Sequence, residues 1–518
     1  MADPLPPSYL HVIHKNRIHF ETAIEEGKYK PVFLWHFLAL AALPLSALII
    51  PRRYGGHYVR HLIFGLVVSL ASDAIRTRRA LLGANGYMAG LIAAWWCIWT
   101  ATLLVFRDPE LEFQRIERVK PSPDIHHATM SNGRTSKYPK EHLAWQPYPK
   151  PLRHRLNWVL GLLLNMRGPE WNWRISSLDP LPSALVPSSA VNKARAVTPE
   201  PSDARTRLQA VAGTFVKTYL ALDLIKVLMM HDPYFWGVVG ASCLPPPFPL
   251  SYLTPLSPVP DFLVYIYRFL LTGTGVYTAV TFVSTLNPLI FLGLSVAFPS
   301  ASRTVTSTPL DAPWLYPDLF GPLLPSALDH GLAGCWAIWW HQLFRFGFTS
   351  TAHGLLSLLP PKYATHRNIR RSVVGIIAFG ISGAMHACGS YTQFSPTHPI
   401  SGPFLFFILQ PVGIAIQDVV AKRLLPAVLA RDTKTLPRWV CRASNFLFAV
   451  GWLLFSARYI MDDFSRGGFW LAEPVPVSLL RGLGLGLGVE GESWWCWREA
   501  WFRSWDGGSF WARGVRVM

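Results

Sequence analysis

Long apolar stretches recur along this chain, and each has about the length that an α-helix needs to cross a bilayer. Two clear cases run over 31–50 and 87–106. In lipid a spanning segment must satisfy its own backbone hydrogen bonds, so runs of this length predict helices. We therefore expect an all-α fold, a polytopic transmembrane helical bundle of about eight to nine spans. The further candidate spans lie at about 210–230, 262–283, 284–299, 372–391, 402–423 and 439–460.

The composition agrees with a membrane protein. Charged residues make up 15% of the 518 residues, whereas soluble domains carry about 25%. Basic residues exceed acidic ones by 18. In a soluble protein this excess would indicate nucleic-acid binding, but in a membrane protein it is typical of cytoplasmic loops that face anionic lipid. We therefore expect a multi-pass integral membrane protein, with the lipid bilayer as a partner and no nucleic acid.

The N-terminal part of the chain is predicted to contain two regions. Residues 1–30 are polar and lack the apolar core of a cleavable signal peptide. Residues 31–106 hold the N-terminal transmembrane helices. Within them the short run 61–75 has basic residues on both sides, which favours a re-entrant or interfacial segment over a spanning one.

The rest of the chain divides into a loop, a second membrane region and a tail. Residues 107–206 contain no spanning segment and predict a large, basic, cytosolic loop that is partly disordered, with 121–150 and 180–205 mobile. Residues 207–460 form the second transmembrane region. The tail 461–518 is rich in Gly and Trp, and two readings stay open: an interfacial anchor, or a segment without function.

Two histidines lie where polar residues are expensive. His386 lies in the apolar segment 372–389, behind the small residues Gly380, Gly383 and Ala384. A neutral imidazole in a dry pocket can accept a proton from a hydroxyl group. The alternative is a core histidine that hydrogen-bonds a backbone carbonyl, and position alone does not decide between the two.

The second histidine lies in the stretch 331–358, which is apolar but interrupted by polar residues. His341 and Gln342 follow the tryptophans at 336, 339 and 340, and Arg345 comes one turn later. Indole and amide groups can donate hydrogen bonds to a carbonyl oxygen that becomes negative during a reaction. An aromatic belt at the membrane interface would explain the tryptophans, but it leaves the histidine and the glutamine unexplained.

The motifs of several other enzyme classes are missing. There is no G-x-S-x-G nucleophile elbow, no histidine with an aspartate four residues on, and no Walker loop. The six cysteines form no C-x-x-C pair, so neither a zinc site nor a disulfide framework is predicted. We expect no bound metal and no covalent enzyme intermediate.

Five short strings occur together in an order that resembles the fungal wax synthase-like acyltransferases, a branch of the membrane-bound O-acyltransferase superfamily. They span about 155–460, which makes 207–460 the wax synthase-like catalytic region. The strings are Arg167-Gly168 followed by Trp171-Asn172-Trp173, then Asp232-Pro233-Tyr234-Phe235, then Trp314 followed by Leu319-Phe320-Gly321, then Trp336 followed by Trp340-His341-Gln342, and Ser382-Gly383 with His386 and Gly389.

The resemblance implies transfer of an acyl group from coenzyme A to an alcohol within the membrane of the endoplasmic reticulum. His386 is the expected base, and donors near His341 and Gln342 are expected to hold the oxyanion. The expected substrate-binding residues are Trp336, Trp340, Arg345 and Ser382. Acetyl-CoA or another acyl-CoA is implied as co-substrate. Fungal members of this kind often acetylate terpenoid or meroterpenoid metabolites, which implies a lipophilic alcohol from secondary metabolism as acceptor.

Other functions remain open at this stage. A long-chain alcohol O-fatty-acyltransferase that makes wax esters uses the same residues, and only the pocket length separates it from an acetyltransferase. The family usually has Phe-Trp-Gly-Arg-Arg before the Trp-His pair, whereas here Cys335, Ala337, Ile338 and Trp339 replace all but the tryptophan, which keeps an inactive homologue possible. A polytopic transporter would show inverted repeats, and none is visible.

Overall fold

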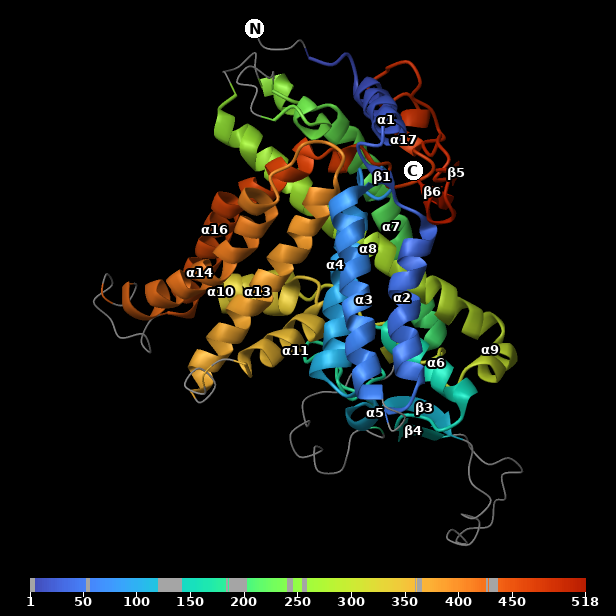
Figure 1. Ribbon diagram of the computed structural model, residues 1–518. Helices are drawn as coiled ribbons and strands as arrows, with labels where there is room; N and C mark the ends of the chain where they lie inside the picture. The colour runs from blue at the N-terminus through green and yellow to red at the C-terminus, as the bar shows by residue number, and fades with distance from the viewer. Residues whose placement is uncertain are drawn as a thin grey trace, which may run out of the picture.

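The computed structural model describes residues 5–52, 56–119, 142–182, 203–239, 246–253, 259–358, 366–424 and 437–518, together with residues 185, 360 and 427. Helices dominate the described residues (Figure 1). The main helices are α1 (Tyr9–Glu25), α2 (Leu34–Ile49), α3 (Gly56–Thr77), α4 (Tyr87–Ala101), α6 (Leu152–Leu163), α7 (Ala204–Met230), α8 (Asp261–Ala297), α10 (Leu323–Gly334), α11 (Arg345–Leu356), α13 (Arg367–Thr392), α14 (Leu405–Val419) and α16 (Arg438–Arg466).

Shorter elements connect and extend these helices. Short α-helices are α5 (Pro109–Glu112), α9 (Pro299–Val305) and α17 (Leu479–Gly482). Wider π-helical turns are η2 (Thr102–Phe106), η9 (Cys335–Trp339), η10 (Ile400–Phe404) and η11 (Val420–Leu424). Tighter 3₁₀ turns are η6 (Pro233–Trp236), η7 (Leu250–Leu253), η8 (Pro313–Leu315), η13 (Phe469–Leu471) and η14 (Phe510–Ala512).

The fold is mostly helical rather than purely α, because three small sheets accompany the helices. Each sheet has two strands. The parallel pair joins β1 (Lys30–Pro31) to β2 (Arg78–Arg79). The antiparallel pairs join β3 (Arg115–Val119) to β4 (His142–Gln146), and β5 (Phe502–Asp506) to β6 (Arg513–Val517). The sequence analysis missed all of these strands, since each is short and lies within a polar or tryptophan-rich stretch.

Six helices of the described chain are long and apolar enough to cross a membrane. The apolar runs 262–283 and 284–299 were expected to be two spans, but they form one helix of 37 residues, α8, with Pro288 inside it. The run 61–75, expected to be re-entrant or interfacial, lies within the 22-residue helix α3, which is long and apolar enough to span. The six helices are Tyr58–Thr77, Tyr87–Phe106, Asp261–Ala297, Ile369–Thr392, Ile400–Leu424 and Arg438–Arg466.

Two of the expected spans are not among these six. The run 31–50 forms α2, an apolar helix that is shorter than a full span. The run 210–230 lies within α7, where Lys217, Asp223 and Lys226 interrupt the apolar residues. The larger number of spans that the sequence suggested therefore depends on these two helices and stays a prediction.

Packing between helices places α13 at the centre of the candidate site. It contacts α4 from the N-terminal group and α11 and α14 from the C-terminal group. Helices α2, α3 and α4 pack side by side, as do α10, α14 and α16, while α7 packs along α8 (Figure 1). Residues far apart in the sequence therefore meet on the surface of α13.

The described part of the large loop is folded against the bundle. Trp158 of α6 and Trp171 and Trp173 of the following turn are buried in one core cluster with Trp95 and Trp99 of α4. Residues 120–141, 183–184 and 186–202, which hold most of the segments expected to be mobile, lie outside the described residues. The domain boundaries drawn from the sequence stay a prediction.

The C-terminal segment packs against the N-terminal one. Tyr9 of α1 donates a hydrogen bond from its hydroxyl to Glu492 at 2.9 Å. The Val517 N–H donates to the carbonyl of Val32 at 2.8 Å, beside the β1–β2 pair. Both chain ends lie at the same end of the molecule, opposite the β3–β4 hairpin (Figure 1). The tail is thus an integral part of the fold.

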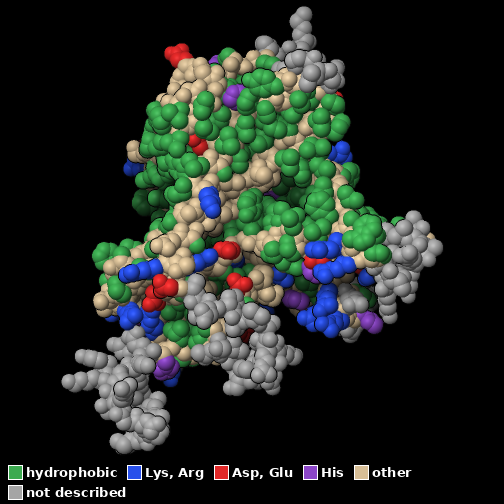
Figure 2. Space-filling model, turned by 180° about the vertical axis from the view of Figure 1, so that it is seen from behind, with side chains coloured by type: hydrophobic (Ala, Val, Ile, Leu, Met, Phe, Trp, Pro, Cys, Tyr) green, Lys and Arg blue, Asp and Glu red, His purple; other side chains and the backbone are tan. Residues whose placement is uncertain are grey.

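The surface separates by polarity along the long axis of the bundle. Hydrophobic side chains cover most of the upper part of the face in Figure 2, and charged side chains gather toward the lower end. This is the end at which β3, β4 and α6 lie in Figure 1. An apolar band beside a charged end is the pattern of a protein that sits in a bilayer.

Candidate active site

The structure brings both candidate histidines to one cavity of about 290 Å³. His386 comes from α13, whereas His341 comes from the turn between η9 and α11. All seven residues predicted as catalytic or substrate-binding line this cavity: Trp336, Trp340, His341, Gln342, Arg345, Ser382 and His386. The geometry places them together, and their chemical roles remain proposals.

Aromatic side chains form the wall between the two histidines. Phe407 of α14 stacks on the imidazole of His386, with ring centroids 4.6 Å apart and an angle of 16° between the planes. Trp336 lies 5.8 Å from Phe407 and 6.1 Å from Trp340. Trp340 in turn lies 5.2 Å from His341. These rings keep the space between the two histidines apolar, which strengthens any hydrogen bond made inside it.

The turn that carries His341 is held by the Gln342 side chain. Its Nε2 donates two hydrogen bonds at 2.7 Å each, to the carbonyl oxygens of Trp336 and Trp340. Its Oε1 accepts a bond of 3.1 Å from the guanidinium of Arg345, which also donates to the carbonyl of Ala337. An amide NH₂ has two hydrogens, so Gln342 has none left for a substrate in this arrangement.

His341 is positioned between the cavity and the loop that precedes α10. Phe320 of that loop packs edge-on against its ring at 5.9 Å. The Nδ1 atom is buried and has no hydrogen-bond partner among the described residues. Burial, helped by the positive charge of Arg167, lowers the pKa of His341 to about 4. The imidazole is therefore neutral at physiological pH.

A hydroxyl group that the sequence analysis missed completes the surroundings of His386. Tyr87 Oη lies 2.6 Å from His386 Nδ1. Tyr87 is the first residue of α4, and 299 residues separate the two partners. The sequence did contain one signal: Gly389, one turn after His386, indicates a close approach on that face of α13. The ring of Tyr87 lies against it.

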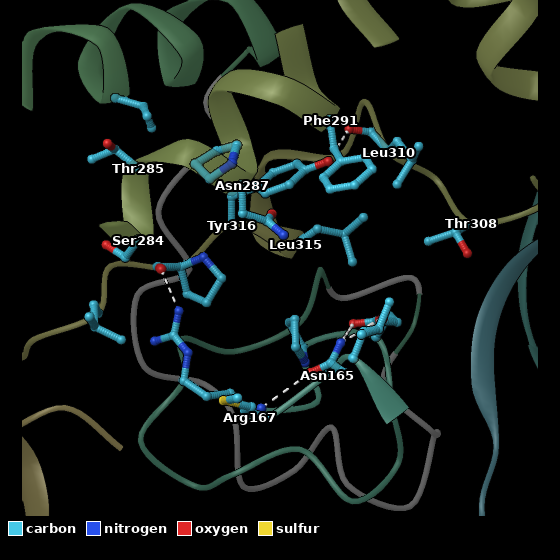
Figure 3. A pocket seen from close by; sticks show the side chains of 18 of the residues that line it. Asn165, Arg167, Ser284, Thr285, Asn287, Phe291, Thr308, Leu310, Leu315 and Tyr316 are labelled. Carbon is cyan, nitrogen blue, oxygen red and sulfur yellow. Dashed lines mark hydrogen bonds between the residues drawn. The ribbon is translucent and has the colours of Figure 1, made fainter. Parts of the chain in front are cut away.

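A second and larger cavity, of about 960 Å³, lies on the other side of the His341 turn. Leu343 and Phe320 line it, while the neighbouring His341 and Phe344 line the small cavity. Polar residues of the otherwise apolar α8 form one wall at helical spacing. Figure 3 shows the wall residues Ser284, Thr285 and Asn287 of α8, with Asn165 and Arg167 elsewhere on the lining.

The larger cavity carries buried positive charge. The Arg167 guanidinium donates to the backbone carbonyls of Pro317 and Asp318, at 2.8 and 2.7 Å, rather than to a carboxylate. Burial lowers the pKa of Arg167 to about 10, so the group stays charged at neutral pH. Arg207 and Arg115 also line the cavity, paired with Asp318 and Glu117 respectively. Such a cavity suits a ligand with anionic groups.

Comparison with known proteins finds one family that resembles part of the chain. The sequence pattern of the membrane bound O-acyl transferase family matches residues 316–409, a segment that contains both histidines. The chain is similar to this family over that segment, which is less than a fifth of its length. No solved structure matches the chain.

Three fungal proteins illustrate the similarity. An O-mevalon transferase of Aspergillus niger is 27% identical over 59% of this chain and 61% of its own length. An O-mevalon transferase of Penicillium terrestre is 25% identical over 58% of this chain and 61% of its own. An acetyltransferase of Aspergillus fumigatus is 30% identical over 24% of this chain and 21% of its own. The chain thus spans about three fifths of the first two relatives.

The family-like strings hold the site in place. Gly168 has φ +63°, and a Cβ there would lie 2.7 Å from the ring of Trp173, so the turn needs glycine. Gly321 approaches η9 so closely that a Cβ would lie 2.4 Å from the carbonyl of Ile338. Asp232 is fully buried and forms two hydrogen bonds with Arg268 of α8, at 2.7 and 2.9 Å. Gly168 and Gly321 lie next to residues that line the large cavity, whereas Asp232 and Arg268 line neither cavity.

The described residues contain no group of three or more His, Cys, Asp or Glu side chains that could hold a metal ion.

Proposed function

We propose that this protein is a membrane-bound O-acyltransferase that moves an acyl group from coenzyme A to a hydroxyl of a lipophilic secondary metabolite. The observation that carries the proposal is the His341 turn, which lies between two cavities. One cavity is small, aromatic and lined by His386. The other is large, has polar and apolar lining residues, and includes three arginines and two carboxylates. This arrangement suits a reaction between an apolar alcohol and an anionic thioester.

In the proposed reaction His386 acts as the base. Its unprotonated ring nitrogen accepts the proton of the acceptor hydroxyl as that oxygen attacks the thioester carbonyl. The new carbon–oxygen bond forms, the carbon–sulfur bond breaks, and the CoA thiolate leaves with the proton returned by His386. Single displacement needs no enzyme nucleophile, in keeping with the absence of a G-x-S-x-G string.

His341 is the proposed donor to the oxyanion. A neutral imidazole carries one hydrogen, and in an apolar cavity a bond to developing negative charge is strong. Because the two amide hydrogens of Gln342 are bound to backbone carbonyls, we assign Gln342 a positioning role instead of a direct one. Arg345 supports the same turn through Gln342 and Ala337.

The larger cavity is the proposed donor site. Its volume is near the upper end of the range of about 300–1,000 Å³ seen for small-molecule sites. Arg115 of β3 and Asn157 of α6 line it, and both elements lie toward the charged end of the molecule. The excess of basic residues favours the cytosol for this end, where acyl-CoA is found.

The acyl group is proposed to be short. The cavity around His386 measures about 290 Å³ and is lined by the large side chains of Trp336, Trp340 and Phe379, so its volume favours a short acyl group beside an acceptor. Acetyl is the first candidate. A mevalonate-derived acyl group is the second, because two relatives carry the name O-mevalon transferase.

The test is ester formation by microsomes that express the protein. Acetyl-CoA, the CoA thioester of mevalonate and palmitoyl-CoA are each supplied with a panel of terpenoid and fatty alcohols. Wild type is expected to form an ester with a short donor, and His386→Ala to lose about 10²- to 10⁴-fold in rate. His341→Ala is expected to lose activity as well. His353→Ala, an exposed histidine of α11, is the matched control and should keep full activity.

Two results would contradict the proposal. Absence of any ester with every donor and acceptor would remove the acyltransferase assignment. Full activity of His386→Ala at normal protein level would remove the assignment of the base. A preference for palmitoyl-CoA would replace the short-acyl assignment by a wax ester synthase.

A further inference from the structure

The hydrogen bond between Tyr87 and His386 determines which ring nitrogen faces the substrate. An imidazole has two nitrogens, and the Nδ1 atom of His386 is hydrogen-bonded to Tyr87 Oη at 2.6 Å. Phe407 covers one face of the ring. The Nε2 atom is thus the nitrogen left for the acceptor. A neutral imidazole can act as a base only at the nitrogen without hydrogen.

Tyr87 is held in this position by close packing on several sides. Its ring is 2% exposed and packs edge-on against Phe464 and Phe469, each at 5.3 Å between centroids. On a further side lies Gly389, where a Cβ would come within 2.9 Å of the Tyr87 ring. A side chain packed this tightly has one orientation, so its hydroxyl points at His386 without further ordering.

The backbone around Tyr87 is clamped to the last turn of α13. Gly86 has φ +90°, and a Cβ there would lie 2.7 Å from the carbonyl of Thr392. The Gly90 N–H donates to Thr392 Oγ1 at 3.0 Å, and that hydroxyl donates to the carbonyl of Gly86 at 3.0 Å. The start of α4 and the end of α13 therefore form one rigid unit that includes both partners.

We propose that Tyr87 is the positioning residue of His386: its hydroxyl oxygen accepts the hydrogen of Nδ1, which keeps Nε2 unprotonated and directed at the acceptor. This inference rests on the proposed function, since it assigns how the proposed base is oriented. It also gives a role to α4, a helix that lies far along the sequence from the family-matched segment 316–409 but packs against α13.

The proton balance of the reaction follows from this tautomer. The acceptor hydroxyl gives its proton to Nε2, and the ring becomes an imidazolium whose Nδ1–H remains bound to Tyr87. The acceptor oxygen forms its bond to the acyl carbon while the bond to sulfur breaks. Nε2 then returns the proton to the thiolate, which restores the starting tautomer. Without the Tyr87 oxygen, the hydrogen can move to Nε2, where the ring is no longer a base.

The test is Tyr87→Phe, which removes the hydroxyl and keeps the ring in its packing. We expect kcat to fall about 10- to 100-fold, less than the loss on removing the base itself, with KM for the acyl donor changed less than about twofold. We also expect a smaller loss with a phenol acceptor than with an aliphatic alcohol, because a phenol gives up its proton more readily. A purely structural defect would lower both rates equally.

Tyr219→Phe is the matched control. Its hydroxyl donates to the carbonyl of Val477 at 2.7 Å, away from the site, and the variant should keep wild-type kcat. Gly389→Ala provides a second test, since the added methyl must displace the Tyr87 ring, whereas Gly380→Ala has only Ile408 at 3.8 Å and should be silent.

The outcomes separate this inference from the function on which it rests. Inactive His386→Ala together with fully active Tyr87→Phe and Gly389→Ala would overturn the role of Tyr87 alone. An equal loss of Tyr87→Phe with phenol and aliphatic acceptors would also overturn it. Full activity of His386→Ala would overturn the proposed base, and the Tyr87 inference with it.

Discussion

Among single residues, Gln342 illustrates how the role of a side chain depends on the turn around it. In the sequence it stands beside His341, and proximity to a histidine favours a catalytic donor. In the structure the π-helical segment η9 ends at Trp339 and the chain reverses, which directs two carbonyl oxygens at the amide of Gln342. Residue types and order predicted which side chains share the cavity. They could not predict that backbone carbonyl oxygens would accept both amide hydrogens of Gln342.

The proximity of Tyr87 to His386 could not be predicted from the sequence, and the reason differs from that for Gln342. The partner of Tyr87 lies 299 residues away, and the contact depends on how α4 and α13 pack. Tyrosine at the start of an apolar helix is also typical of the membrane interface, so its residue type carries little information. The glycines that permit the contact are visible in the sequence, but their partners are not.

A single bulky substitution tests whether the large cavity binds the acyl donor. Ser284 of α8 lines the large cavity, and Ser284→Trp would fill part of it. We expect KM for the acyl donor to rise about 10-fold or more, the effect of roughly 1.4 kcal/mol of lost binding, with a smaller change in KM for the alcohol. Val283→Trp is the control, since Val283 is 61% exposed on the outer side of the same helix. Equal effects of the two variants would contradict the donor-site assignment.

Among the elements, α8 shows where a pattern of apolar residues is ambiguous. Apolar runs alone do not mark where one helix ends, and the runs 262–283 and 284–299 were therefore expected to be separate spans. Helices within a membrane protein tolerate proline because neighbouring groups satisfy the freed backbone. Here Pro288 is buried and lines the large cavity, so the helix continues through it. The helical class was predictable from the sequence, whereas the division into spans required the packing.

The link between η6 and α8 provides a prediction of stability. Asp232 is fully buried and bound to Arg268 by two hydrogen bonds. Asp232→Ala would leave the arginine without its counter-charge, which costs about 3–5 kcal/mol in buried pairs. Thermal unfolding of the purified protein in detergent measures the loss. Asp418→Ala, which breaks an exposed pair between Asp418 of α14 and Lys422 of η11, should cost less than about 1 kcal/mol. Similar losses in both variants would contradict a structural role for the buried pair.

Over the whole molecule, the two chain ends form one cap on the bundle. Arg481 binds Glu473 through both guanidinium nitrogens at 2.8 Å and also contacts the hydroxyl of Tyr9. Lys226 of α7 lies 3.9 Å from Glu473 and donates to the carbonyl of Trp470 at 2.6 Å. The composition of the tail did not predict that it folds against the bundle, since its contacts are made with segments that lie far away along the sequence.

The cap predicts how stability depends on pH. Burial alone would raise the pKa of Glu473, but Lys226 and Arg481 outweigh it and lower the pKa below the ordinary 4.5. The stabilisation from this carboxylate is therefore complete above about pH 4.5 and is lost as the pH falls through the lowered value. The unfolding midpoint of wild type should drop more steeply on acidification than that of Glu473→Gln. The exposed Glu490→Gln is the control and should follow wild type.

The same cap has a consequence for biosynthesis. Lys226 is translated 244 residues before Trp470, whose carbonyl holds its ammonium group. At about 5–20 residues per second, the ribosome needs about 12 to 50 s to supply that partner. During this interval α7 carries a cation without the carbonyl partner that the finished protein provides.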